Sequence, residues 1–290
     1  MRTNAMTVDV EDYFQVSAFE NHVAREAWES TPMRVEQNMA RILALFDEHK
    51  VKATFFTLGW IAERHPGMVR EIVANGHELA SHGWQHTRVT TQSPEEFRQD
   101  IARTRALLED TGGVEVRGYR AASYSIGASN LWALDVLADE GYAYSSSIAP
   151  IRHDLYGMPD APRFSFRAAQ GRITEIPVST VQIFRRNINC GGGGWFRLFP
   201  YAFSRWALHR VNHRDERSTH FYFHPWEVDP EQPKVPDVGF KTRFRHYLNL
   251  SRMESRLHQL LEDFSWDRMD RVFADDIAGT AADLGEVRKP

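Results

Sequence analysis

Short apolar runs alternate with amphipathic helical patterns from the first residues to about position 145, and this alternation most constrains the fold. An apolar run at residues 7–10 is followed by apolar residues at helical spacing over 35–46, and then by a second apolar run at 51–58. A parallel sheet with crossover helices produces such a pattern. The sequence therefore predicts an α/β fold.

Later segments continue the alternation. Ser93-Pro94-Glu95-Glu96 is a capping box with proline at the first helical position, so we expect a helix from there to Gly112. Residues 149–168 show no clean period and predict a long ordered loop. The glycine run 191–194 lacks the Lys-Ser/Thr ending of a P-loop and is expected to be a lid or a linker. The remaining expected elements are helices at 66–75, 130–140, 200–211 and 242–261 and strands at 78–80, 114–119, 142–146, 173–178 and 220–224, followed by a tail with little apolar content.

The composition fits one globular domain. The 290 residues are 42% hydrophobic, and α/β barrels often reach this length as one domain. The formal net charge is −4, so we expect no nucleic-acid partner. Cys190 is the only cysteine and cannot form an internal disulfide, which fits a reducing compartment. No apolar stretch is long enough to span a bilayer and the first residues lack a signal-peptide core, so we expect a cytoplasmic protein and leave peripheral membrane contact open.

Two histidines follow the strand expected at residues 78–80. His82 and His86 stand four apart, so on a helical turn both imidazoles would face one ion. Two ordinary surface histidines are the alternative. The position favours a site, because α/β folds bind ligands at the carboxyl ends of parallel strands.

Three acids, Asp9, Glu11 and Asp12, stand at the end of the first expected strand. Asp9 and Glu11 would share one face of that strand, whereas Asp12 stands where the chain should turn outward. One carboxylate beside two histidines gives three protein ligands and an open position, as in catalytic zinc sites. A second carboxylate nearby would serve as a general base. A solvated acidic turn is the alternative.

Two further strand ends carry candidate residues. His224 ends the strand expected at 220–224 and is a candidate proton donor, whereas His220, about 13 Å away along that strand, is expected to be packed. Arg120 follows another strand, where it could pair with a carboxylate and keep the pKa of that carboxylate low. A surface salt bridge is the alternative for Arg120 alone. Four strand ends with residues suited to one reaction favour a catalytic site.

In this combination the residues resemble the NodB-type polysaccharide deacetylases of carbohydrate esterase family four. The opening Val8-Asp9-Val10-Glu11-Asp12-Tyr13-Phe14 is similar to that of the exosortase-associated exopolysaccharide deacetylases in particular. The likeness covers nearly the whole chain, including the loop at 152–157, the glycines before Trp195 and the segment 240–250. It implies a deformed (β/α) barrel over residues 1–235, with inserted loops at about 149–170 and 187–218, and a C-terminal helical extension and polar tail over 236–290.

The resemblance also implies a role for each candidate residue. Asp9 would be the catalytic base and Arg120 would orient it. His82 and His86 would bind a divalent metal together with Glu11 or Asp12. His224 would be the general acid, and the backbone N–H near Tyr124 would help to form the oxyanion hole. The expected metal is zinc, with cobalt or nickel as alternatives.

Three positions depart from the family pattern. The first motif reads Asp9-Val10-Glu11-Asp12, so either Glu11 or Asp12 could bind the metal, with Glu11 favoured by its register. Ala122 stands where the third motif often has proline, which could loosen the oxyanion loop. Ser145 stands where the fourth motif often has an acid, so the group that tunes His224 is not predicted.

The implied activity is metal-dependent removal of N-acetyl groups from N-acetylhexosamine units of a bacterial exopolysaccharide or its lipid-linked precursor, at the cytoplasmic face of the membrane. Trp84, Trp195 and Trp226 lie near the motifs and are candidates for stacking on sugar rings, with plain packing as the alternative. Three other functions stay open: a hydrolase of a small cyclic amide, a catalytically silent carbohydrate-binding module, and a non-haem iron oxygenase, which also uses two histidines and one carboxylate. The oligomeric state is not predicted.

Overall fold

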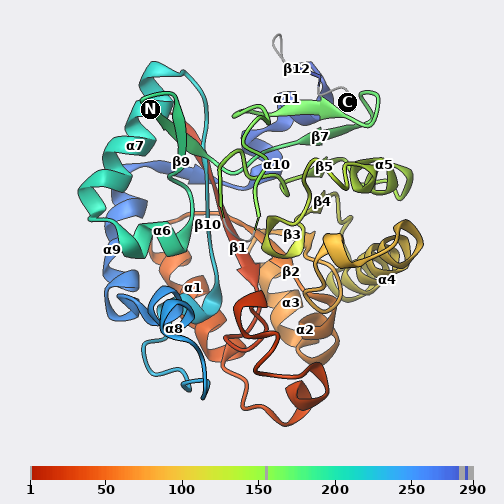
Figure 1. The fold of residues 1–290 in the computed structure, drawn as a ribbon, viewed down its shortest axis with the longest axis vertical. Helices are drawn as coiled ribbons and strands as arrows, with labels where there is room; N and C mark the ends of the chain where they lie inside the picture. Colours follow the sequence, from red (N-terminus) through yellow and green to blue (C-terminus); the bar gives the residue numbers. More distant parts are fainter. Residues whose placement is uncertain (1, 154–155, 281–284, 287–290) are drawn as a thin grey trace.

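The computed structural model describes residues 2–153, 156–280 and 285–286, which form a strongly curved sheet covered by helices (Figure 1). The main sheet has the strand order β10-β1-β2-β3-β4-β5-β7-β6-β12, and β11 also pairs with β1. Of these pairs, β6 with β7 is antiparallel and the others are parallel. The strands are β1 (Thr3–Val10), β2 (Thr54–Thr57), β3 (Glu78–Ser81), β4 (Gly118–Tyr119), β5 (Tyr144–Ser145), β6 (Phe166–Ala168), β7 (Ile173–Glu175), β10 (His220–Phe223), β11 (Ser265–Asp267) and β12 (Gly285–Glu286), with a separate hairpin of β8 (Thr180–Ile183) and β9 (Arg186–Asn189).

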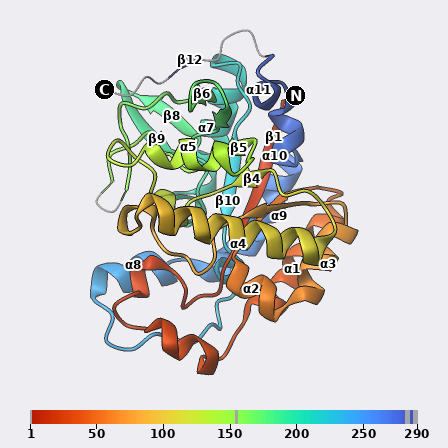
Figure 2. The same ribbon diagram turned by 90° about the vertical axis from the view of Figure 1, so that its right-hand side faces the viewer.

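Helices cover the outside of this sheet (Figure 2). In α1 the buried residues recur at helical spacing and include Met39, Ile42 and Phe46, so this helix packs one apolar face on the sheet. The expected capping box opens α4, where Ser93 accepts a hydrogen bond from the Glu96 N–H. The helices are α1 (Val35–Glu48), α2 (Gly59–Arg64), α3 (Pro66–Ala74), α4 (Pro94–Gly112), α5 (Trp132–Asp139), α6 (Gly193–Leu198), α7 (Tyr201–Arg214), α8 (Phe240–Tyr247), α9 (Met253–Asp263), α10 (Met269–Val272) and α11 (Ala274–Ala278).

Strand β1 lies in the middle of the sheet. Its residues 4–10 are all buried, as expected for a parallel strand covered on both faces. Ala5 pairs with His220 of β10 on one edge and with Asp267 of β11 on the other, and β2 continues the second edge from Thr7 onward. The central strand therefore joins the first and last parts of the chain.

The fold class predicted from the alternation is confirmed, and so are most of the expected elements. The single helix expected over 242–261 is wrong, because the chain breaks between α8 and α9. Asn249 adopts a left-handed conformation with φ 53 there, and its side-chain amide donates to the Arg197 carbonyl at 2.8 Å. Tertiary hydrogen bonding thus ends a helix that the apolar periodicity would continue.

Two more expectations need correction. The segment 187–218, expected as an inserted loop with a helix at 200–211, contains β9 and α6 in addition to the expected helix, which is α7. The expected polar tail includes α10, in which Met269 is fully buried, and α11, and Phe273 between the two helices is nearly fully buried. The backbone N–H of Met269 donates to Thr54 Oγ1 at 2.8 Å, so this segment is fixed under the sheet. In the loop motif at 152–157, residues 154 and 155 lie outside the described residues.

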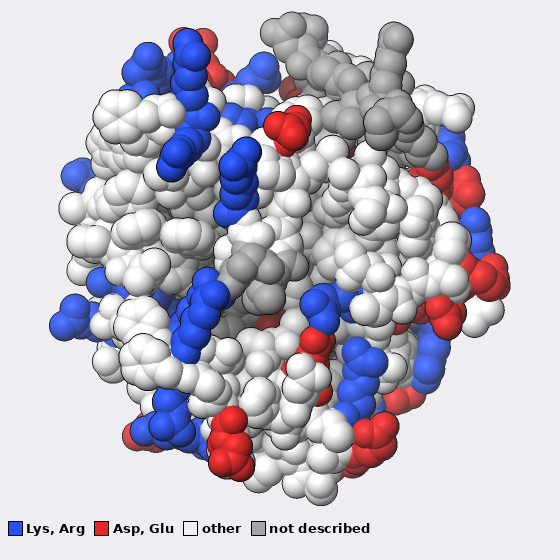
Figure 3. All heavy atoms as spheres, viewed as in Figure 1, with Lys and Arg blue, Asp and Glu red and all other residues white. Residues whose placement is uncertain are grey.

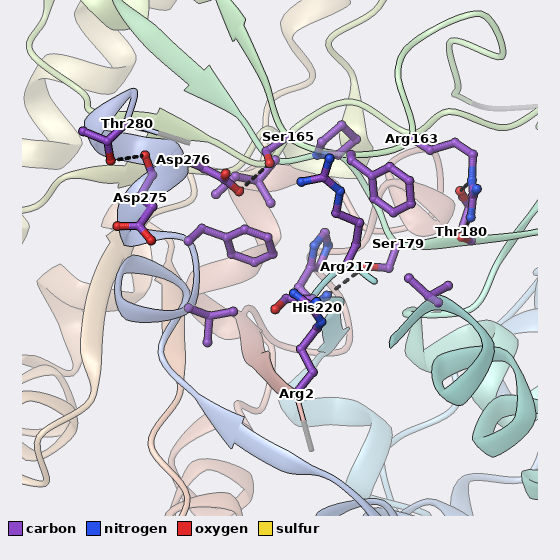
Figure 4. Close-up of a pocket in the computed structure, with 17 residues that line it drawn as sticks. Arg2, Arg163, Ser165, Ser179, Thr180, Arg217, His220, Asp275, Asp276 and Thr280 are labelled. Atoms are coloured by element: carbon purple, nitrogen blue, oxygen red, sulfur yellow. Dashed lines mark hydrogen bonds between the residues drawn. The ribbon is translucent and has the colours of Figure 1, made fainter. Parts of the chain in front are cut away.

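Cavities lie at both ends of the barrel. One, of about 400 Å³, lies at the amino ends of the strands, where Arg2, Arg217 and His220 line it together with residues of α11 (Figure 4). The other, of about 540 Å³, lies at the carboxyl ends and contains the candidate catalytic residues. Among the described residues no helix is long and apolar enough to cross a membrane.

The burial of Met269 predicts that the C-terminal segment stabilises the barrel. Met269→Ala should lower the free energy of unfolding by about 2–5 kcal/mol, because it leaves a cavity under β1. Met33→Ala is the matched control, since Met33 is 38% exposed and its loss should change stability by less than about 0.5 kcal/mol. Urea denaturation followed by circular dichroism measures both. Equal effects of the two substitutions would show that the segment is not part of the core.

Candidate active site

The carboxyl ends of four parallel strands bring the predicted residues together. Asp9 and Glu11 come from the end of β1, His82 follows β3, Arg120 follows β4 and His224 follows β10. Neighbouring strands pair in parallel from β10 through β1, β2 and β3 to β4, so all these ends lie at one edge of the sheet. Except for Arg120, which lies beneath them, these side chains line the cavity at the carboxyl ends.

Glu11, His82 and His86 form a group that could hold a metal ion. Each offers one ligand atom, and these atoms lie within 4.8 Å of one another. The Nδ1 of His82 is 2.8 Å from the Arg120 carbonyl oxygen, which assigns its proton to Nδ1 and leaves Nε2 as the ligand atom. Glu11 Oε2 lies 3.0 Å from His86 Nε2, and His86 Nδ1 is buried without a hydrogen bond to any described residue. Two imidazoles and one buried carboxylate with their ligand atoms this close fit a divalent cation.

Asp12 does not join this group, which corrects its place among the expected metal ligands. Its Oδ2 accepts hydrogen bonds from the backbone N–H groups of Arg34 and Val35, at 2.6 and 2.9 Å, and its Oδ1 accepts one from Tyr13 at 2.8 Å. The carboxylate therefore holds the start of α1. Residues Glu11 and Asp12 are adjacent in sequence, and their side chains point to different partners.

Asp9 lies against Arg120 inside the barrel. The Arg120 Nη1 donates to Asp9 Oδ1 at 2.5 Å and to Thr7 Oγ1 at 2.9 Å. The same guanidinium donates to the backbone and side-chain oxygens of Ser146, and it is fully buried. Arg120 thus orients Asp9, as expected, and leaves Asp9 Oδ2 toward His224, 3.9 Å from its Nε2.

The sequence did not identify the acid that holds His224. His224 Nδ1 is 2.8 Å from Glu227 Oε1, and Arg197 Nε donates to Glu227 Oε2 at 2.7 Å. Glu227 and Arg197 are almost fully buried. Glu227 therefore takes the place of the acid that was sought at Ser145, whose hydroxyl instead bonds to Ser147. Its signal in the sequence was the capping-box position three residues after His224.

Aromatic rings and a glycine fix the position of this pair. The ring of Trp226 stacks between those of His224 and His246, with centroid distances of 5.1 and 4.1 Å. A Cβ at Gly193 would lie 2.3 Å from Glu227 Oε1. The glycine run is thus a packed segment that lets the backbone approach Glu227, and the expectation of a lid or linker is corrected.

The charges around the pocket tune its titratable groups in opposite directions. Burial lowers the pKa of His82 to about 4, which keeps this imidazole neutral and able to bind a metal. Burial would also lower the pKa of His224, but Glu11 and Glu227 raise it to about 9. Burial would raise the pKa of Glu11, yet His86 and His224 lower it to about 2. Without a metal, His224 is therefore the protonated group and Glu11 is the ionised one.

The loop expected to supply the oxyanion donor contains Ser123 and Tyr124. The backbone N–H of Tyr124 donates to the Ala121 carbonyl at 3.0 Å, so it is not free for a substrate oxygen. The neighbouring residue Ser123 has a left-handed backbone with φ 52 and lines the pocket. Its N–H has no acceptor in the described part of the chain and is the better candidate donor. The Tyr124 ring also lines the pocket and packs on Tyr222.

Of the three candidate tryptophans, Trp226 lines the pocket. Trp84 is 9% exposed and packs under the Arg103 guanidinium, 3.3 Å from its ring centre. Trp195 stacks on Phe199. The structure therefore gives Trp84 and Trp195 a packing role, while Trp226 supports His224. Cys190 is buried, and burial raises the pKa of its thiol to about 12.

Two family models match successive parts of the chain. Residues 27–145 match the polysaccharide deacetylase model. This segment is similar to the polysaccharide deacetylase family. Residues 146–274 match a domain of unknown function, DUF3473, and include His224 and Glu227. Asp9 and Glu11 precede both matches, so the pocket is built from three stretches of the chain.

Curated relatives match part of the chain. A peptidoglycan-N-acetylglucosamine deacetylase of Listeria monocytogenes is 39% identical over 72 residues, which cover 24% of this chain and 16% of that protein. A chitooligosaccharide deacetylase of Sinorhizobium fredii is 34% identical over 103 residues, 35% of this chain and 45% of that protein. The chain thus spans less than half the length of these relatives.

Solved structures show the same fold. A candidate polysaccharide deacetylase of Mycobacterium smegmatis superposes with a TM-score of 0.65 at 18% identity, over 100% of this chain and 96% of that chain. A pseudoenzyme of carbohydrate esterase family four from Bacillus anthracis superposes with a TM-score of 0.51 at 14% identity, over 93% of this chain and 65% of that one. The deformed (β/α) barrel expected from the sequence is confirmed.

The group of Glu11, His82 and His86 predicts the metal ligands. Glu11→Gln and His82→Ala should each weaken zinc binding at least about tenfold, because each removes one of three ligands. Asp12→Asn is the matched control, since Asp12 bonds to the start of α1, and it should leave the affinity unchanged. Isothermal titration calorimetry with zinc measures the affinities. A loss with Asp12→Asn as large as that with Glu11→Gln would contradict the assignment.

The Glu227 contact predicts a change that can be measured without any substrate. In the metal-free protein Glu227→Gln should bring the pKa of His224 down from about 9 toward its ordinary value, because a carboxylate is lost at 2.8 Å. Titration of the histidine ring signals by NMR measures this pKa. Ser145→Ala is the control and should leave it unchanged. If Ser145→Ala moved the pKa and Glu227→Gln did not, the assignment would be wrong.

Proposed function

We propose that this protein removes N-acetyl groups from N-acetylhexosamine units of a bacterial exopolysaccharide or its lipid-linked precursor, as a metal-dependent hydrolase. The observation that carries the proposal is that a carboxylate held by Arg120, an imidazole held by Glu227 and a three-residue metal group converge on one pocket. The named activities of the curated relatives support the substrate class. The similarity of the opening residues supports the exosortase-associated subtype.

Glu11, His82 and His86 would hold the metal, for which we propose zinc. A divalent ion bound there would polarise the acetamide carbonyl and lower the pKa of the attacking water. Two imidazoles and one carboxylate leave an open position for substrate and water. The remaining steps are performed by residues of the pocket.

Asp9 acts as the general base. It takes the proton of the water whose oxygen forms a bond to the carbonyl carbon. The buried Arg120 fixes the orientation of Asp9 through the bond at 2.5 Å. The Ser123 N–H donates to the oxygen that becomes negative, and such a donor contributes about 3–4 kcal/mol of barrier lowering.

His224 acts as the general acid. As the carbon–nitrogen bond breaks, its Nε2 gives a proton to the leaving amine, and acetate remains. Glu227 accepts the hydrogen bond from Nδ1, so the proton that is transferred is the one on Nε2. Nε2 lies 3.5 Å from Glu11 Oε1, and this distance supports a proton donor close to the proposed metal ligands.

The proposal predicts metal-dependent release of acetate from N-acetylglucosamine oligomers. Purified protein reloaded with zinc or cobalt should release acetate, and Asp9→Asn or His224→Ala should lower the rate at least about a hundredfold, because each removes a proton-transfer group. Trp84→Phe is the control and should retain most activity, since Trp84 lies outside the pocket.

Other outcomes identify the alternatives. Sugar binding that survives Asp9→Asn, with no turnover under any metal, would indicate a silent carbohydrate-binding module. Turnover of a cyclic amide without turnover of glycans would indicate the small-amide hydrolase, and strict dependence on oxygen would indicate the oxygenase. The cytoplasmic location stays a prediction, and recovery of the protein from the exported fraction would refute it.

A further inference from the structure

Two exposed elements beside the pocket carry phenylalanine next to arginine. Phe184 is 97% exposed at the tip of the β8–β9 hairpin and is followed by Arg185 and Arg186. On α8, Phe240 is 84% exposed and Phe244 47% exposed, with Arg243 between them. We call these six residues the aromatic–basic surface.

Local structure does not explain Phe184. Phe184 and Arg185 both have positive φ, 46 and 62, as in a tight hairpin turn that favours Asn-Gly. A bulky side chain is strained in this conformation and here gains no burial. The position is therefore unsuited to phenylalanine by turn preference and by packing alike, which favours a role for the exposed ring.

Both elements lie on one side of the molecule. Figures 1 and 2 both place the hairpin and α8 on the left, the hairpin above and α8 below. On the face seen in Figure 3 the left half carries mainly Lys and Arg among uncharged side chains, whereas most Asp and Glu side chains lie toward the right edge and the bottom. An extended flat partner could contact both elements at once, and a small ligand could not.

The same side borders the mouth of the pocket. Lys241, Thr242 and Arg245 of α8 line the pocket, on the helix that carries Phe240 and Phe244. The hairpin is tied to the loop that borders the pocket, because the Asn187 amide donates to the Pro150 carbonyl at 2.8 Å. A partner on this surface would thus lie beside the pocket.

The chemistry of the surface is complementary to an anionic membrane. The α8 sequence Phe-Lys-Thr-Arg-Phe-Arg-His-Tyr contains no acid, although the whole chain has a net charge of −4. No carboxylate of the described residues pairs with Arg185, Arg186 or Arg243. Aromatic rings beside basic side chains suit the headgroup region of anionic lipids, where the negative surface potential attracts each Lys or Arg near the surface.

We propose that the aromatic–basic surface binds an anionic lipid bilayer, so that the pocket opens beside the membrane. Phe184, Phe240 and Phe244 enter the boundary between headgroups and acyl chains, and the arginines pair with lipid phosphates. This binding does not depend on the proposed deacetylase activity. If that activity holds, the arrangement delivers glycans linked to lipid carriers to the pocket.

Vesicle flotation with the full chain tests the proposal. The protein should float with vesicles of phosphatidylcholine and phosphatidylglycerol, and much less with phosphatidylcholine alone or at high salt, because screening weakens charge attraction. The combined variant Phe184→Ser, Phe240→Ser and Phe244→Ser should bind at least about tenfold more weakly. Arg186→Glu with Arg243→Glu should abolish the preference for anionic vesicles.

Trp206→Ser is the matched control, because Trp206 on α7 is 44% exposed and lies outside the surface. It should bind vesicles as the unchanged protein does. The combined variant should keep its circular dichroism spectrum and its acetate release from soluble oligomers, so that a failure of the membrane proposal is distinguished from a failure of the proposed activity.

Two outcomes would overturn the proposal. The first is absence of vesicle binding by the unchanged protein, or equal binding by the combined variant. The second is a dimer in solution that the phenylalanine substitutions convert to a monomer without any vesicle binding, which would assign the surface to contact between two copies of the chain.

Discussion

The fully buried guanidinium of Arg120 is the group on which the site depends. Its donors reach Asp9 and Thr7 on β1 and Ser146 after β5, and its own carbonyl holds His82 after β3. A buried charge is tolerated only with such partners, and removal of one partner leaves the other uncompensated at a cost of about 3–5 kcal/mol. The Arg120 guanidinium and carbonyl therefore hold the carboxyl ends of β1, β3, β4 and β5 together.

A second buried ion pair, Arg197 with Glu227, does the same for the other side of the pocket. Arg197 also donates to the carbonyls of Arg245, His246 and Leu248, at the end of α8. The side chain that fixes Glu227, and through it His224, thus also fixes the helix beside the pocket mouth. The ion pair of Arg197 and Glu227 thus sets both the position of His224 and the shape of the pocket entrance.

The sequence predicted the parts of this site that depend on strand ends, because a parallel sheet collects them at one edge. Asp9, His82, His86, Arg120 and His224 were found in this way and lie together. Glu227 and Arg197 were missed, since their contact joins a short turn to α6, 30 residues earlier, and no local period reports such a contact. The choice between Glu11 and Asp12 stayed open for a similar reason, because it depends on backbone N–H groups at residues 34 and 35, which fold back onto Asp12. The packing of Met269 under the sheet was hidden by the polar residues around it.

The junction of the two family models falls at residues 145 and 146, directly after β5. β5 pairs with β4 from the first segment and with β7 from the second, so the junction runs through a continuous sheet. The two segments are therefore halves of one folding unit, and neither has a complete sheet without the other. His224 and Glu227 lie in the second segment, whereas His82 and His86 lie in the first. An exchange of the second segment between related chains would thus change the surroundings of His224, the pocket entrance and the outer surface in a single step.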